Sequence, residues 1–229
     1  MEKIFDIKSL YKHRDRFNLE FKSNDFIFSR TAEQICSKLN EINRDFTKVI
    51  ELEGRNNLLF NKIKDSELIH KKNISEYYNL GMNGHVKTNI EQLPVLNNSF
   101  DLIISNLFLH WINDLPGTLI QIRKALKQDG LFIGTMFGSG TLKELDESFR
   151  IAEYKIKGKI SPRISPFVDI KDAGNLLQRA GFNLIVCDTD FLNIEYNNPL
   201  ELLKDIRYMG ESNCLVEREK FFLRKDILK

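Results

Sequence analysis

The segment formed by residues 93–137 constrains the fold of this chain more than any other part of the sequence. It contains a continuous apolar run at residues 102–104, which is typical of a parallel strand covered by helices on both faces. Ser105 and Asn106 then make the end of this strand polar, and a second apolar run follows at residues 131–137. Two such strands joined by a helix within about 40 residues form a βαβ unit.

The helix between these two strands is predicted from its spacing and its ends. Asn113 or Asp114 is placed to cap its start, and Pro116 suits its first turn, where no backbone N–H is needed. Gly130 is expected to end the helix in a left-handed conformation. Apolar residues recur every three or four positions and predict a stripe that faces the sheet: Leu115, Leu119, Ile122 and Leu126.

The rest of the chain predicts further elements of the same α/β class. A helical N-terminal arm is expected over residues 1–46, with its last helix at residues 28–42. Strands are expected at residues 48–52, 69–74, 85–88 and 183–195, and helices at residues 58–68, 141–152, 169–181 and 199–209. These patterns predict one domain, residues 1–229, with a mostly parallel sheet and helices on both faces.

Composition favours an intracellular globular protein. The chain has 229 residues, of which 42% are hydrophobic and 29% charged, so it can bury a core without disulfides or metals. Cys36, Cys187 and Cys214 are far apart and odd in number, which favours free thiols in a reducing compartment and predicts no metal site. The sequence shows neither a signal peptide nor an 18-residue apolar span, and a cytoplasmic location is expected.

Charge gives little reason to expect a nucleic-acid partner. The net charge of +2 comes from 34 basic and 32 acidic residues that are interspersed along the chain. The densest basic run, at residues 12–16, is interrupted by Asp15. It is interpreted as a solvated helix face, with a phosphate or partner contact as the alternative.

Five segments together resemble the respiratory complex I assembly-factor family within the class I S-adenosylmethionine-dependent methyltransferase superfamily. They are FDIKSLYKHRDRF (5–17), NNSFDLIISNLFLHWINDLPG (97–117), DGLFIGTMFG (129–138), SPRISPFVDIKDAGNLLQRAGF (161–182) and MGESNC (209–214). The malonyl-carrier-protein O-methyltransferases resemble the chain more distantly. The resemblance implies a Rossmann-like sheet, a cofactor-binding half at residues 47–138 and a substrate-side half at residues 139–229. It also implies an iron–sulfur subunit of complex I as the partner whose arginine is modified.

In this family an acidic residue in the first strand precedes a loop with three closely spaced glycines, which lets methionine and ribose approach the backbone. The resemblance makes Glu51 this acidic residue. Aligned without a gap, the glycine places fall to Glu53, Arg55 and Asn57. With a one-residue gap Gly54 fills a glycine place and Asn56 replaces the last glycine. The alternative is that the loop only turns the chain from strand to helix and binds no ligand.

The other cofactor contacts implied by the resemblance fall on amide side chains. Asn73, followed by Ile74, takes the place of the acid at the end of the second strand, which accepts the ribose hydroxyls. Asn89, followed by Ile90, takes the adenine-binding place, and Asn106 lies at the end of the 102–104 strand. A charge-assisted hydrogen bond contributes roughly 1.5–3 kcal/mol, against about 1 for a neutral one. Two such losses and a clash of side chains in the loop predict binding that is two to four decades weaker, or lost.

Candidate residues for chemistry and for substrate contact lie in the better-matched second half. His110 and Trp111 follow the 102–104 strand, where His110 is a candidate general base or positioning group. The alternative is that both rings only pack the strand end. The resemblance implies that Arg163 and Glu211 face the substrate, although loop and helix-end roles fit their segments equally well.

The C-terminal part is expected to lack one element of the family fold. The last antiparallel strand of the sheet would follow residue 229, so its absence would leave an unpaired edge. A homodimer or a protein partner is therefore expected at that edge. Two functions are carried forward: an enzyme that uses S-adenosylmethionine, and a non-catalytic assembly chaperone or decaying pseudoenzyme that binds a protein partner.

Overall fold

The computed structural model describes residues 3–82, 84, 86–219 and 227, and divides them into two compact units. The sheet unit comprises Phe26–Phe137 and Ile170–Cys187. The helical unit comprises Met1–Asp25, Gly138–Asp169 and Asp188–Lys229. Each unit draws on separate stretches of the chain and is described by itself. The expected single domain stays a prediction.

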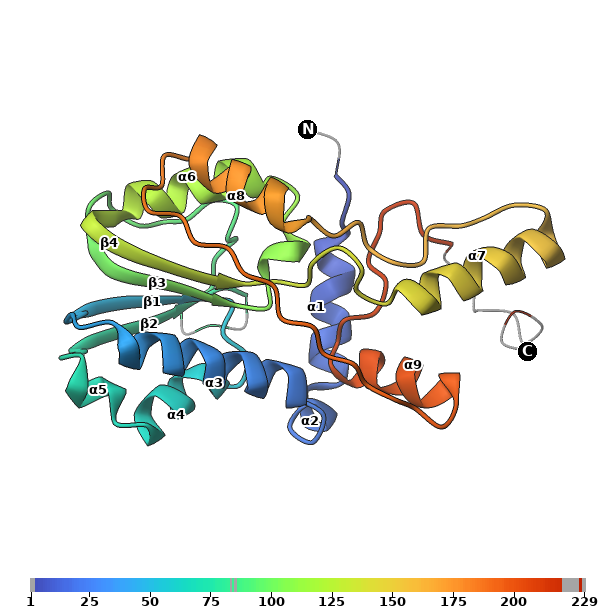
Figure 1. Cartoon of the computed structure of the whole chain (residues 1–229), viewed down its shortest axis with the longest axis horizontal. Coiled ribbons are helices and arrows are strands. Elements are labelled where there is room, and N and C mark those ends of the chain that lie inside the picture. The colour runs from blue at the N-terminus through green and yellow to red at the C-terminus, as the bar shows by residue number, and fades with distance from the viewer. Residues whose placement is uncertain (1–2, 83, 85, 220–226, 228–229) are drawn as a thin grey trace. The chain divides into compact units, whose positions relative to one another are not determined.

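A four-stranded parallel sheet forms the centre of the sheet unit (Figure 1). Its strands are β1 (Lys48–Leu52), β2 (Glu76–Leu80), β3 (Phe100–Asn106) and β4 (Leu126–Thr135), in the order β2-β1-β3-β4. Because all pairs are parallel, the carboxyl ends of the strands meet at one edge of the sheet. This is the edge at which Rossmann-like folds bind their ligands.

Helices cover both faces of this sheet. One face packs against α3 (Phe26–Glu41), α4 (Leu58–Asp65) and α5 (Leu68–Lys71), and α6 (Leu115–Ala125) and α8 (Ile170–Arg179) lie over the other (Figure 1). The core beneath α3 is fully buried and includes Ala32, Ile35, Leu39, Val49, Leu59, Ile63, Leu102 and Ile104. Burial of this apolar area is the main stabilising contribution.

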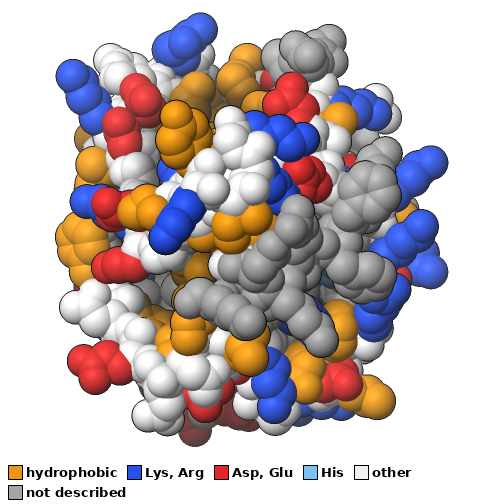
Figure 2. Space-filling view, turned by 90° about the vertical axis from the view of Figure 1, so that its right-hand side faces the viewer, with side chains coloured by type: hydrophobic (Ala, Val, Ile, Leu, Met, Phe, Trp, Pro, Cys, Tyr) orange, Lys and Arg blue, Asp and Glu red, His pale blue; other side chains and the backbone are white. Residues whose placement is uncertain are grey.

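The helical unit contains α1 (Ile7–Arg16), α2 (Asn18–Phe21), α7 (Lys143–Lys157) and α9 (Pro199–Tyr208). A buried ion pair joins distant parts of this unit, because Arg14 Nη2 lies 2.7 Å from Glu211 Oε1. Phe5 and Leu215 form an antiparallel bridge in the same unit. Figure 2 shows acidic, basic and hydrophobic side chains interspersed on the described part of one face of the molecule.

Several predicted elements are confirmed. The first strand lies at Lys48–Leu52, the apolar run at residues 102–104 lies within β3, and α3 covers most of residues 28–42. The helix after β3 begins where expected, and Asp114 rather than Asn113 caps it, since its side chain accepts from Gly117 N at 2.9 Å.

Three predictions about the central elements are wrong. Gly130 does not end α6, because Leu126 already enters β4 and the left-handed residue is Asp129, with φ +58°. The second strand lies at Glu76–Leu80, since Ile69 belongs to α5. The region is polar, so apolar spacing placed this strand too early in the chain. Of the third strand predicted at residues 85–88, position 85 lies outside the described residues, and the described remainder forms a single parallel bridge between Val86 and Leu80.

The long strand predicted at residues 183–195 is also wrong. These residues are described, and none of them belongs to a strand. They include four consecutive apolar residues at positions 184–187, yet Leu184, Val186 and Phe191 are exposed. A strand needs a backbone partner, and apolar residues alone do not supply one. The last antiparallel strand of the family fold would follow residue 229, and its expected absence stays a prediction.

Candidate functional site

Glu51 and Gly54 form the inner layer of the site at the end of β1. Glu51 is 1% exposed, and Tyr77 Oη donates to its Oε2 at 2.7 Å. Burial raises the pKa of Glu51 to about 7, and the hydrogen bond from Tyr77 opposes this shift. A Cβ on Gly54 would lie 2.3 Å from Cδ of Glu51. The only glycine in this loop is therefore required by the packing of Glu51.

Three residues of the loop after β1 adopt the left-handed conformation that favours glycine. Glu53, Asn56 and Asn57 have φ values of +54°, +50° and +54°. Asn adopts this left-handed region readily, but Glu pays about 1–2 kcal/mol there. Glu53 and Asn57 are two of the three positions that the ungapped alignment assigns to glycines. Asn56, which the gapped alignment assigns to the last glycine, is left-handed as well, so the local conformation fits both alignments.

The side chain of Glu53 reaches across to the end of β2. Its Oε1 accepts a hydrogen bond from Met82 N at 2.9 Å, and its backbone N–H donates to Leu80 O at 2.7 Å. A Cβ on Gly81 would lie 2.4 Å from Cδ of Glu53. Glu53 is 2% exposed, so its carboxylate fills the space beside the strand end.

Asn79 and Arg55 complete the loop. Asn79 Oδ1 accepts from Gly54 N at 3.0 Å, and its Nδ2 donates to Gly54 O at 2.9 Å. Arg55 is buried, with its guanidinium carbon 5.3 Å from the ring centre of Phe28. Asn79 was missed because the second strand was placed too early. A polar residue directly before the end of the EYYNL segment is the signal that could have found it.

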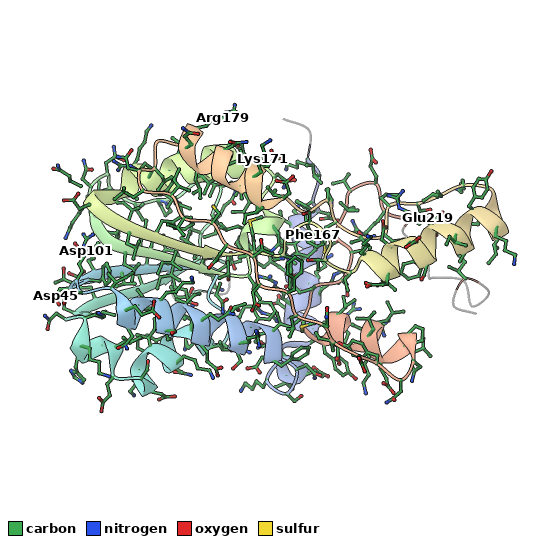
Figure 3. The ribbon with its side chains drawn as sticks, in the orientation of Figure 1. Asp45, Asp101, Phe167, Lys171, Arg179 and Glu219 are labelled. Carbon is green, nitrogen blue, oxygen red and sulfur yellow. The ribbon has the colours of Figure 1, made fainter. Side chains whose placement is uncertain are left out.

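Asn73 and Ile74 do not lie at the site. They precede β2, and Asn73 Nδ2 donates to Asp45 Oδ2 at 2.7 Å. Figure 3 shows Asp45 together with Asp101 at the amino end of the strands, which is opposite to the carboxyl edge. The premise that Asn73 ends the second strand is therefore wrong.

Asn89 and Ile90 lie in the loop between β2 and β3. Asn89 Oδ1 accepts from Glu91 N at 3.1 Å, whereas Ile90 is buried. The chain reaches them from the carboxyl end of β2, because Gly81 N donates to Val86 O at 3.0 Å. Their expected role toward adenine stays a prediction.

Asn106 joins three elements at the end of β3. Its Oδ1 lies 2.7 Å from Thr31 Oγ1 of α3 and 3.1 Å from Thr135 Oγ1 of β4, and its Nδ2 donates to Phe28 O at 3.0 Å. The side chain is buried. Its amide is thus used to hold the elements together, and its predicted cofactor contact is not tested.

His110 and Trp111 lie in a short 3-10 helix, Leu109–Trp111, that follows β3. Both are buried, and the His110 ring lies 4.8 Å from the Phe137 ring and 5.3 Å from the Trp111 ring. This aromatic cluster supports the interpretation that the pair packs the strand end. A chemical role for His110 stays a prediction.

Arg163 and Glu211 belong to the helical unit, where each is held in an ion pair. Arg163 Nε donates to Glu153 Oε1 at 3.0 Å, and its Nη2 lies 3.2 Å from Glu219 Oε2 (Glu219 is labelled in Figure 3). Burial raises the pKa of Glu153, but hydrogen bonds from Arg163 and Ser161 hold it below its usual range. Glu211 pairs with Arg14, as described above.

The described residues contain neither a metal cluster nor a membrane-spanning helix. No described group of three or more His, Cys, Asp or Glu side chains is arranged to hold a metal ion. Across the part of the chain that the structure describes, no helix is long and apolar enough to cross a membrane.

Comparison with known proteins gives matches along most of the chain. A family model described as a methyltransferase domain matches residues 66–134. The mouse protein named mitochondrial arginine-hydroxylase NDUFAF5 is 37% identical over 213 residues, which cover 89% of this chain and 62% of that protein. The zebrafish protein of the same name is 34% identical, and the match covers 98% of this chain and 73% of that protein. The chain thus spans about 62% of the length of the mammalian relatives.

Two further matches are to proteins described as putative methyltransferases. A putative methyltransferase of Rickettsia prowazekii is 41% identical over 135 residues, which cover 59% of this chain and 60% of that protein. Among solved structures, the Haloferax volcanii complex of the Trm112 methyltransferase activator with a putative methyltransferase matches with a TM-score of 0.56. That match covers 93% of this chain and 99% of the other at 15% identity, so it bears on the fold alone. The sheet described above is that of a Rossmann-like class I methyltransferase.

Proposed function

This chain belongs to the family of the mitochondrial arginine hydroxylase NDUFAF5, and from that premise we propose that its S-adenosylmethionine site is closed by its own side chains. The chain would then be a methyltransferase-like protein with weak or lost cofactor binding that acts by binding a protein partner. The proposal rests on Glu53, whose buried carboxylate lies beside Gly81 at the end of β2.

Two properties of Glu53 support closure. A ligand at the carboxyl end of β2 would have to share the space that the carboxylate fills, next to the backbone of Gly81. To make room, Glu53 would have to give up the hydrogen bond from Met82 N. Loss of this part-buried hydrogen bond costs about 1 kcal/mol, which corresponds to somewhat less than one decade of affinity. The residues present therefore do not fit the cofactor.

One observation favours an enzyme as the second candidate. The carboxylate of Glu53 occupies the place beside the β2 end where an acidic side chain would accept the ribose hydroxyls, while Gly81 itself supplies none. If Glu53 served as that acceptor, the chain would bind S-adenosylmethionine through a charge-assisted contact. We call the first possibility, in which Glu53 blocks the site, closure, and the second, in which Glu53 accepts the ribose hydroxyls, substitution. The two predict opposite effects of removing the side chain of Glu53.

Titration calorimetry with S-adenosylhomocysteine separates the two. Closure predicts no measurable binding by the unmodified chain at about 1 mM ligand, and binding at least about tenfold tighter by Glu53→Gly. Substitution predicts binding by the unmodified chain and a loss in Glu53→Gly. Glu67→Gly is the matched control, because Glu67 is also left-handed, with φ +57°, and lies at the start of α5. Micromolar binding by the unmodified chain would overturn closure.

The partner and the location belong to the same proposal. An iron–sulfur subunit of respiratory complex I is the expected partner through the resemblance of the motifs, and homodimerisation is the alternative. The matched animal relatives are named mitochondrial, whereas composition alone favours a cytoplasmic location. Pull-down of a purified iron–sulfur subunit by the unmodified chain, with an unrelated globular protein as the control bait, tests the partner directly.

A further inference from the structure

A cavity of about 280 Å³ lies in the sheet unit, on the face of β1 and β2 opposite α3. Tyr77 packs against the core beneath α3, and successive residues of a strand point to opposite faces, so Tyr78 points away from that core. Tyr78 pairs in register with Ile50, which places both on the face that carries the cavity. The wall of the cavity is formed by Lys48, Tyr78, Leu80, Val86, Pro94, Val95, Leu96, Ser99 and Phe100.

This cavity is separate from the site at the carboxyl edge of the sheet. Its wall contains none of the residues that the resemblance assigns to the cofactor, such as Glu51, Gly54 and Asn89. Lys48 and Phe100 are instead the first residues of β1 and β3, at the amino end of the strands. The volume is just below the roughly 300–1,000 Å³ of pockets that hold drug-sized ligands. The cavity therefore suits a single ring better than a molecule as large as S-adenosylmethionine.

Aromatic rings form one part of the wall. The rings of Tyr78 and Phe100 meet edge to face, with their centres 6.3 Å apart and their planes at 87°. Another ring added beside them would gain the same kind of contact, which favours aromatic over aliphatic ligands. Val86 and Leu96 are 43% and 80% exposed, so a ligand can reach the cavity from solvent.

The charged groups beside the cavity are balanced. Lys48 Nζ lies 3.0 Å from Glu76 Oε2, and Tyr78 Oη donates to the same oxygen at 2.6 Å. A second pair nearby joins Lys127 Nζ to Asp101 Oδ1 at 2.9 Å. An anionic ligand would be repelled by Glu76 and a cationic ligand by Lys48. The arrangement therefore favours an uncharged ligand.

Lys48 gives such a ligand a polar anchor. Its ammonium group lies 5.8 Å from the ring centre of Tyr78 and 5.6 Å from that of Phe100, so it lies beside any ring that packs there. The group has three N–H donors, and one of them faces Glu76. A hydroxyl group suits this pair, because its oxygen can accept from Lys48 while its hydrogen is donated to Glu76.

We propose that this cavity binds a phenol group, an uncharged aromatic ring that carries one hydroxyl. The ring would pack against Tyr78 and Phe100, and the hydroxyl would bond to Lys48 and Glu76. The phenol can belong to a free small molecule or to a tyrosine side chain of another protein, and both offer the same chemistry. The cavity does not involve the loop after β1, so the proposal holds whether or not that loop binds a cofactor.

NMR titration of the full chain with small aromatic probes tests the proposal. We expect p-cresol, which is uncharged at pH 7, to shift the backbone amides of Val95, Leu96 and Ser99 in a saturable way at about 1–10 mM. Toluene has the same ring without the hydroxyl and should bind about tenfold more weakly. The anion 4-methylbenzoate should also bind more weakly than p-cresol. Absence of saturable shifts at these amides would overturn the proposal, as would equal binding of toluene or tighter binding of 4-methylbenzoate.

Two lysine variants locate the polar anchor. Lys48→Met keeps an unbranched side chain without donors, so it should weaken p-cresol binding about tenfold and leave toluene binding unchanged. Lys127→Met is the matched control, because Lys127 is exposed to a similar extent and does not line the cavity. Unchanged p-cresol binding by Lys48→Met, or equal weakening by both variants, would contradict the assigned site.

A final titration with N-acetyltyrosinamide separates the two sources of the phenol. Binding at least as tight as that of p-cresol assigns the cavity to a tyrosine of a protein chain. Binding of p-cresol together with exclusion of N-acetyltyrosinamide assigns it to a free small molecule. Failure of both compounds to bind overturns the proposal and leaves the test of Glu53 unaffected.

Discussion

The loop after β1 and the end of β3 lie at the same edge of the sheet and are both filled by side chains of the protein, but by different means. At the end of β3, Asn106 bonds three elements and His110 and Trp111 pack with Phe137. The buried carboxyl group of Glu51 lies at the start of the loop. Within the loop, Glu53, Asn56 and Asn57 adopt left-handed conformations that glycine would take at lower cost. Left-handed residues occur in both regions, because Leu107 at the β3 end has φ +52°, so the two regions differ in the contacts that hold them.

The largest expected effect is at the β3 end. Trp111→Ala should lower the free energy of unfolding by about 3–5 kcal/mol, because it removes a fully packed ring and leaves a cavity. Denaturant unfolding measures this change. Tyr154→Ala is the control, since Tyr154 is 67% exposed on α7, and it should change stability by less than about 0.5 kcal/mol. A small effect of Trp111→Ala would remove the contrast between the two regions.

The pH dependence of stability should reveal the cost of Glu51. The pKa of this carboxyl is about 7 in the folded chain and 4.5 as the ordinary value, so the folded state holds the proton more tightly. The contribution of Glu51 to the free energy of unfolding is therefore largest below pH 4.5. It falls by about 3 kcal/mol as the pH rises to about 7 and then levels off.

Thermal unfolding at several pH values checks this slope. Glu51→Gln should flatten it between pH 4.5 and 7, because the amide cannot ionise. Glu41→Gln alters an exposed residue at the end of α3 and should keep the slope. A free energy of unfolding that rises from pH 4.5 to 7, and loses this rise in Glu51→Gln, would contradict the prediction that the folded chain buries Glu51 in its neutral form.

A pair of amide substitutions compares the regions directly. Asn106→Ala removes contacts to α3 and β4, whereas Asn79→Ala removes two hydrogen bonds to Gly54. Each should destabilise the chain by about 1–3 kcal/mol, with the larger loss for Asn106. Chemical denaturation measures both, and Asn97→Ala, at an exposed position, serves as the reference. The reverse order would mean that the loop, not the β3 end, anchors this edge.

The smallest expected effect is a gain. Glu67→Gly relieves a left-handed Glu and should raise the melting temperature by the equivalent of about 1 kcal/mol or less. Glu53→Gly should gain less than Glu67→Gly, because it also removes the hydrogen bond from Met82 N. Differential scanning calorimetry compares the two variants. A marked loss of stability in Glu53→Gly alone would show that the hydrogen bond of the Glu53 carboxylate stabilises the chain by more than the left-handed backbone of Glu53 costs.

The elements that the sequence predicts well are those with local signals. The bounds of β1, the apolar run of β3 and the Asp114 cap follow from residues that are neighbours in the chain. The position of β2 was wrong because its residues are polar and its register comes from pairing with β1. Residues 183–195 include an apolar run at positions 184–187 but have no described backbone partner in a strand. The residue pattern of a segment predicts whether it can form a strand, and backbone pairing with another strand determines whether it forms one.

The candidate site was predicted in part for the same reason. Glu51 and Gly54 lie at the end of β1, as expected, but the sequence does not reveal that Gly54 is small to accommodate Glu51. The contact of Glu53 with Gly81 and Met82 joins residues 28 or 29 positions apart, and no local pattern encodes it. Asn79 was missed because the strand that carries it was misplaced.

The two hydrogen bonds between Asn79 and Gly54 also bear on how this edge opens and closes. The clamp joins the loop after β1 to β2, the outermost strand on that side of the described sheet. When β2 separates from β1 in a local opening, Gly54 loses both partners at once and the strained residues around it can relax. Protease cleavage within residues 53–57 would then report the separation of β2, so nicking of this loop measures the local stability of the sheet edge.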